Sequence, residues 1–138
     1  MRSVFVFMSD VDLGEVRAWL DRAATQIGID SWRWPQEGDG VLFPGLVKNL
    51  DDFDCEELES ARIALEKEVE VIVQIDVTGR RQGNVEVEEF LGEIMTTFSA
   101  VAQDDHTAHS WTLEELRSGA QVQGHGFFDT QGWYEEGN

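Results

Sequence analysis

Alternation of apolar and polar residues is strongest between residues 69 and 78, which read VEVIVQIDVT. Every second residue is a valine or isoleucine, and the intervening positions are polar except for Ile72. A period of two predicts a strand with one buried and one exposed face, and β-branched side chains suit such a surface. A strand within a parallel sheet would be apolar on both faces. We therefore expect an antiparallel or mixed sheet that helices cover on one face.

Helical spacing of apolar residues follows a short predicted strand at residues 3–8. It predicts a helix over residues 11–27, because apolar side chains recur there every three or four positions. Ser9 or Asp10 is the expected cap of this helix, and Gly28 is its expected left-handed stop.

Two further helices are predicted on either side of the central strand. Residues 85–98 carry the broadest apolar face, and residues 55–68 follow Asp54, which with Glu57 resembles a capping box. Cys55 is expected to be a buried, inert thiol. Four glutamates are expected on the outer face of the helix at 55–68: Glu56, Glu57, Glu59 and Glu66. The inward residues of the central strand are expected to be buried beneath the helices at 11–27 and 85–98: Val71, Val73 and Ile75.

The remaining segments have weaker patterns. Trp32 and Trp34 are expected to cover the core, and residues 41–43 suggest a short strand that Pro44-Gly45 ends. Residues 100–103 and 107–111 could pair as a hairpin.

A short helix is predicted near the C-terminus. Thr112 and Glu115 form a capping box for a helix that ends at Gly119. Residues 120–138 form an aromatic, glycine-rich tail that is expected to pack on the body. The order of elements predicts one domain over residues 1–138, an α+β fold built as a two-layer sandwich.

Net charge is the unusual property of this 138-residue chain. The total is −18; residues 1–50 carry 7 acidic and 5 basic side chains, and the rest carry 21 acidic and 5 basic. A field of this sign repels nucleic acid and anionic membranes and attracts basic proteins, although it also serves solubility. The single cysteine excludes an internal disulfide. The apolar run at residues 4–8 is too short for a signal sequence or a membrane span, which makes the cytoplasm the expected location.

The three histidines lie close together in the sequence, at His106, His109 and His125. Imidazole and carboxylate groups are ligands for Zn²⁺ or Fe²⁺ and serve in acid/base catalysis, so a small metal-dependent or acid/base enzyme is one alternative. However, His106 and His109 would point to opposite faces of an extended strand. No phosphate-binding loop, nucleophile motif or zinc-protease motif is present. We therefore predict no metal, no cofactor and no enzymatic activity.

Two binding functions remain. In the first, the acidic surface of residues 51–138 attracts a basic protein and tryptophans anchor the complex. In the second, carboxylates imitate a phosphate backbone and occupy a DNA-binding protein. Clustered charge mixed with aromatic residues favours the first function. The candidate partner-binding residues are Trp111, Trp133, Glu86, Glu88, Glu89, Asp104 and Asp105.

The layout resembles that of a family of small acidic proteins. Trp111, the segment 124–129 (GHGFFD) and the segment 133–136 (WYEE) form a tryptophan-bearing, glycine-rich acidic end on a small single domain. In this respect the chain resembles bacterial toxin-immunity proteins. The resemblance implies a cytoplasmic bacterial protein that binds and inhibits a cognate toxin, often a basic nuclease, and it assigns no role to any single residue.

Overall fold

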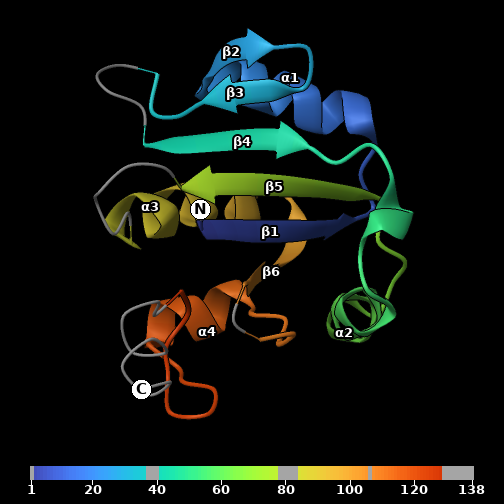
Figure 1. Ribbon diagram of the computed structural model, residues 1–138, viewed down its shortest axis with the longest axis vertical. Coiled ribbons are helices and arrows are strands. Elements are labelled where there is room, and N and C mark those ends of the chain that lie inside the picture. Colours follow the sequence, from blue (N-terminus) through green and yellow to red (C-terminus); the bar gives the residue numbers. More distant parts are fainter. Residues whose placement is uncertain (1, 37–40, 78–83, 106, 129–138) are drawn as a thin grey trace.

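The structure is a computed structural model that describes residues 2–36, 41–77, 84–105 and 107–128 (Figure 1). Within these ranges the chain forms a six-stranded sheet with four α-helices and one short 3₁₀ helix. The strands are β1 (Arg2–Ser9), β2 (Thr25–Gly28), β3 (Ser31–Arg33), β4 (Leu42–Leu46), β5 (Val71–Val77) and β6 (Ser99–Asp104). The helices are α1 (Leu13–Ala23), η1 (Leu50–Asp52), α2 (Cys55–Leu65), α3 (Asn84–Thr97) and α4 (Leu113–Ser118).

All neighbouring strands of the sheet are antiparallel, in the order β2-β3-β4-β5-β1-β6. The predicted central strand is β5, which pairs with β1 on one side and β4 on the other. Val73 lies opposite Val6 and Leu46, so these apolar residues of β5, β1 and β4 point to the same face of the sheet. The predicted α+β sandwich with an antiparallel sheet is therefore confirmed.

One face of the sheet holds the larger core. Here α1 and α3 pack on the inward residues of β1, β4 and β5, as Figure 1 shows for α3 behind the sheet. Val73 and Ile75 are fully buried and Val71 is only 3% exposed, which confirms the prediction for these three residues. Trp32 and Trp34 are also buried in this core, as expected.

The opposite face is only partly covered. Ala61 of α2 packs with Phe7, Ile72 and Val101 in a smaller apolar cluster at the β1–β6 end of the sheet (Figure 1). Of the described helices, none covers the part of this face formed by β3, β4 and the second half of β5, where side chains line an open hollow. We call this part the open face.

The first helix ends earlier than the sequence pattern predicts. α1 stops at Ala23, and Thr25–Gly28 forms β2 at the sheet edge, so Gly28 lies in a strand and is not a helix stop. The cap is Asp12, whose Oδ1 accepts from the backbone nitrogen of Glu15 at 2.8 Å, and not Ser9 or Asp10. Ile27, which continues the helical spacing past the true end, lies in β2 and is 51% exposed.

Four further predictions were wrong in detail. β4 runs through Pro44-Gly45, which were expected to end a strand. Asp54 is the cap residue of α2 but makes no side-chain capping bond, and Cys55 is exposed and not buried. The predicted hairpin is reduced to one bridge between Ala102 of β6 and Trp111.

The described part of the C-terminal tail packs on the body. Phe128 is 1% exposed within the larger core, and Phe127 packs against it. Residues 129–138 lie outside the described ranges. Nowhere in the described part of the chain does a helix combine the length and apolar character needed to cross a membrane.

Candidate functional site

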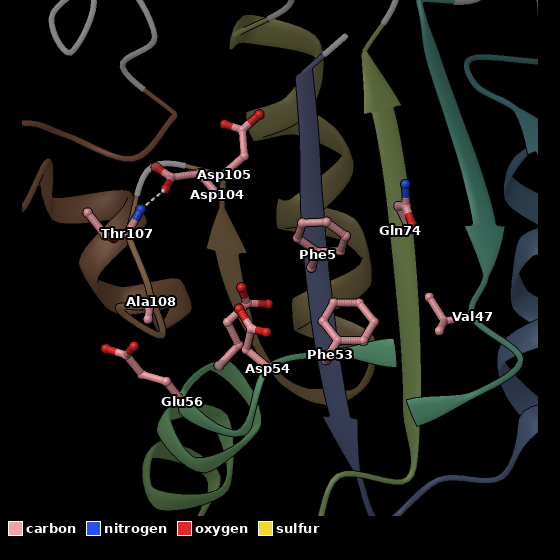
Figure 2. A pocket seen from close by; sticks show the side chains of 11 residues that line it. Phe5, Val47, Phe53, Asp54, Glu56, Gln74, Asp104, Asp105, Thr107 and Ala108 are labelled. Carbon is pink, nitrogen blue, oxygen red and sulfur yellow. Dashed lines mark hydrogen bonds between the residues drawn. The ribbon is translucent and has the colours of Figure 1, made fainter. Parts of the chain in front are cut away.

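A hollow of about 590 Å³ lies beside the open face, where the first turn of α2 meets the loop after β6 (Figure 2). Its walls come from segments far apart in sequence: β1, the residue that follows β4, the segment before α2, α2, β5, and residues 104–105 and 107–108. Five of its lining residues are acidic and, among the described residues, none is basic. We call it the acidic pocket, lined by Phe5, Val47, Phe53, Asp54, Glu56, Glu57, Gln74, Asp104, Asp105, Thr107 and Ala108.

The start of α2 brings three of these carboxylates together. Asp54 precedes the helix, and Glu56 and Glu57 lie in its first turn, where negative charge interacts favourably with the helix dipole. A partly buried hydrogen bond connects this turn to the sheet, because Gln103 Nε2 of β6 donates to the carbonyl oxygen of Glu57 at 2.9 Å. The same nitrogen donates to Ser110 Oγ at 3.0 Å. These two hydrogen bonds hold the first turn of α2, and with it the carboxylates, against β6.

Electrostatic repulsion within the pocket is visible at Glu57. Burial raises the pKa of this carboxyl, and the neighbouring charges of Asp54 and Glu56 raise it further. The charged form of Glu57 is thus less favourable here than in water. A cation in the pocket would reverse this effect.

One wall of the pocket is aromatic. The ring of Phe53 meets Phe5 edge to face at a centroid distance of 5.1 Å, and it meets Phe7 at 5.6 Å. Figure 2 shows Phe5 and Phe53 side by side next to the acidic side chains. Carboxylates beside aromatic rings form a suitable environment for an ammonium or guanidinium group, because the ring faces also attract cations.

The two aspartates predicted from sequence line this pocket, and they differ in role. Asp104 is 4% exposed, and its carboxylate accepts from the backbone nitrogens of Thr107 at 3.2 Å and Phe128 at 2.9 Å. Asp105 is exposed and accepts from the backbone nitrogen of Ser3 at 3.3 Å. Asp104 therefore holds the loop and the tail in place, whereas Asp105 offers charge at the surface.

The other predicted partner-binding residues lie elsewhere. Trp111 is 2% exposed, bridges to Ala102 and contacts the rings of His109 and Phe127, so little of its surface is available to a partner. Glu88 and Glu89 are exposed and Glu86 is half-buried, all on α3. α3 covers the face of the sheet opposite the pocket, so the structure does not bring these glutamates to it. Trp133 lies outside the described residues.

The described histidines serve in structural contacts. His109 Nε2 lies 3.0 Å from Glu115 Oε2. Burial acts to raise the pKa of Glu115, but hydrogen bonds from Thr112 and His109 outweigh it and leave this pKa lowered. His125 is buried and pairs with Val122 through the backbone. His106 lies outside the described residues, and the described ones contain no group of three His, Cys, Asp or Glu with the geometry to hold a metal.

Sequence reasoning missed most of the pocket. Asp54, Glu56 and Glu57 were assigned to capping and to a solvated helix face, and Phe5 and Phe53 were not singled out. One signal was available, since the segment 51–59 (DDFDCEELE) places an aromatic residue among six acidic ones. What the pattern could not reveal is that β1 and the end of β6 lie against this segment.

Comparison with known proteins gives no assignment, since no protein-family model, curated protein or solved structure matches this chain.

Proposed function

We propose that this protein binds a basic protein partner and inhibits it by occupying its functional surface, as bacterial toxin-immunity proteins do. The observation that carries the proposal is the acidic pocket, in which five carboxylates surround a hollow that no described basic residue lines. A lysine or arginine of the partner would enter it. The expected setting is the cytoplasm of the bacterium that makes the toxin or nuclease.

Physical chemistry supports this partner. A cation in the pocket would offset the repulsion that raises the pKa of Glu57, so binding would stabilise the pocket as well as the complex. Charge-assisted hydrogen bonds to carboxylates are stronger than neutral ones. The excess of negative charge in residues 51–138 would also speed the encounter with a basic surface.

The alternatives lack a comparable feature. An acid/base or metal enzyme would need His106, His109 and His125 to converge, and His109 is engaged with Glu115. A DNA mimic needs a long double row of carboxylates, whereas these carboxylates surround a hollow of limited size. Inhibition of a basic toxin or nuclease remains the proposal.

The test is to co-express the protein with the product of the neighbouring open reading frame and purify the complex. A basic partner in a one-to-one complex is expected. The double variant Glu56→Gln/Glu57→Gln should weaken this complex by at least about tenfold, since hydrogen bonds to charged groups contribute roughly 1.5–3 kcal/mol each.

A matched control is available on the same helix. Glu59 is paired with Arg62 and does not line the pocket, so Glu59→Gln should leave the affinity unchanged. An acidic partner, or equal affinity for the double variant and the wild type, would contradict the proposal.

A further inference from the structure

The acidic pocket continues into a second hollow on the open face. This hollow has a volume of about 380 Å³ and shares Val47 and Gln74 with the pocket. The strand register shows why the two are continuous: Phe5 lies opposite Gln74, Gln74 opposite Gly45, and Gly45 opposite Ser31. One row of residues thus crosses four strands, from the floor of the pocket to the second hollow.

Gly45 lines the second hollow. It has no side chain, and its neighbours on the same face are Phe43 of β4 and Val47, which directly follows β4; both are half-buried. A Cβ at this position would lie 3.3 Å from the backbone oxygen of Asp30, and the hollow lies over Gly45 between the side chains of Phe43 and Val47. We call this space the Gly45 hollow.

Three of the four polar side chains that line the Gly45 hollow already have partners: Gln74, Asp76 and Lys48. Asp76 accepts from Ser3 Oγ at 2.8 Å and from Gln74 Nε2 at 3.0 Å. Lys48 lies 3.6 Å from the carboxylate of Asp30. These side chains already engage one another or Asp30, and the apolar surface of Phe43 and Val47 favours an apolar incoming side chain.

We propose that the open face is a second contact for the same basic partner: a cationic side chain of the partner enters the acidic pocket, and an apolar side chain on the same segment fills the Gly45 hollow. This inference rests on the proposed function and adds the chemistry of the partner's segment. Charge complementarity sets the cationic end, and the apolar surface of Phe43 and Val47 beside Gly45 sets the other end. Side chains two residues apart in an extended segment are separated by about 7 Å, and the length of an arginine supplies the remaining reach.

Two matched peptides test the inference without the natural partner. The probes are acetylated, amidated pentapeptides of sequence Gly-Arg-Gly-Phe-Gly and Gly-Arg-Gly-Ser-Gly, titrated into the ¹⁵N-labelled full chain by NMR. Both should shift the amide signals of Glu56 and Glu57. Only the phenylalanine peptide should also shift Gly45 and Val47, and it should bind about fivefold tighter or more, as expected for partial burial of an aromatic ring.

Two variants test whether the tighter binding of the phenylalanine peptide comes from the open face. Phe43→Ala should remove the difference between the two peptides, while Ile63→Ala, which truncates an exposed residue of α2 outside both hollows, should preserve it. Thermal unfolding of both variants verifies that they are folded.

The possible failures are distinguishable. Equal affinities with shifts confined to Glu56 and Glu57 would overturn this inference and leave the proposed function standing. Absence of shifts at Glu56 and Glu57 would overturn both. Shifts of Gly45 on dilution without peptide would assign the open face to a second copy of the chain, and nuclear Overhauser contacts from residues 129–138 to Phe43 would assign it to the chain itself; either outcome overturns the inference.

Discussion

Glu57 is a residue at which stability and binding are expected to oppose each other. Burial and the charges of Asp54 and Glu56 raise its pKa, so its anion is less favourable in the folded protein than in the unfolded chain. Such a group destabilises the free protein at neutral pH. Residues kept at a cost in stability are typical of binding sites.

Replacement of Glu57 by glutamine should therefore raise the melting temperature of the free protein at pH 7 by about 1–2 °C, a small effect because solvent screens a partly exposed carboxylate. The folded-state pKa lies above the usual 4.5, so the penalty exists above that pKa and disappears as the pH falls through it. Thermal unfolding between pH 4 and 7 should show the gain of Glu57→Gln shrinking with acidity. Glu59→Gln should have the opposite sign, since the hydrogen bond from Arg62 lowers the pKa of Glu59. A destabilised Glu57→Gln protein would contradict the repulsion described here.

Asp104 has the opposite character, because its carboxylate is a structural acceptor. Asp104→Asn keeps the shape but replaces one acceptor oxygen by a donor facing the backbone nitrogen of Thr107 or Phe128. The free energy of unfolding in urea should fall by about 1–3 kcal/mol. Asp105→Asn, at the adjacent exposed position, should change it far less. Equal effects of the two substitutions would show that Asp104 does not hold the loop and tail.

At the level of elements, the clearest patterns gave the best predictions. The central strand β5, the helix α3 and the Thr112–Glu115 capping box are present as expected, the last with both of its reciprocal hydrogen bonds. These elements are specified locally, by side-chain period and capping chemistry.

The elements missed are those that tertiary pairing decides. Pro44 lies within β4 although proline donates no backbone hydrogen bond. Its nitrogen faces β3, as the nitrogen of Leu42 does when it bonds to Trp34, and the β3–β4 ladder there is correspondingly short. β2 was missed because an edge strand of four residues has too few positions to display a period. Sequence alone could not specify that β1 lies between β5 and β6, and this order builds the acidic pocket.

The register of the sheet can be tested by a substitution in the central strand β5. Val73 is fully buried and lies opposite Val6 and Leu46, so Val73→Asp would place an unpaired charge in the core. The cost should exceed about 4 kcal/mol and abolish cooperative thermal unfolding as seen by circular dichroism. Val85→Asp is the matched control, because Val85 is 63% exposed on α3. A stable Val73→Asp protein would contradict the assigned register of β5.

For the whole molecule, the net charge of −18 implies repulsion within the folded state. Salt should relieve it, because the Debye length falls from about 30 Å at 0.01 M to about 10 Å at 0.1 M. We expect the melting temperature of the free protein to rise over this range of sodium chloride. A melting temperature that falls would indicate that the exposed ion pairs, such as Lys67 with Asp10 and Arg62 with Glu59, outweigh the repulsion.

The same field determines how a partner should associate. Because residues 51–138 carry most of the negative charge, the association rate with the captured basic partner should fall at least about tenfold as salt screens the attraction. The dissociation rate should change less, since it depends on contacts made at short range. Stopped-flow or surface-based kinetics at about 20 and 500 mM salt separate the two rates.

The position of each glutamate determines whether its removal changes the association rate or the dissociation rate. Glu88→Gln/Glu89→Gln removes charge from α3, on the face of the sheet opposite the acidic pocket, so it should slow association slightly and leave dissociation unchanged. Glu56→Gln/Glu57→Gln removes the same charge from the pocket itself and should also speed dissociation, because a cation held there loses its acceptors. If the two double variants gave the same pair of rates, the total charge alone would govern binding and the pocket would have no special role.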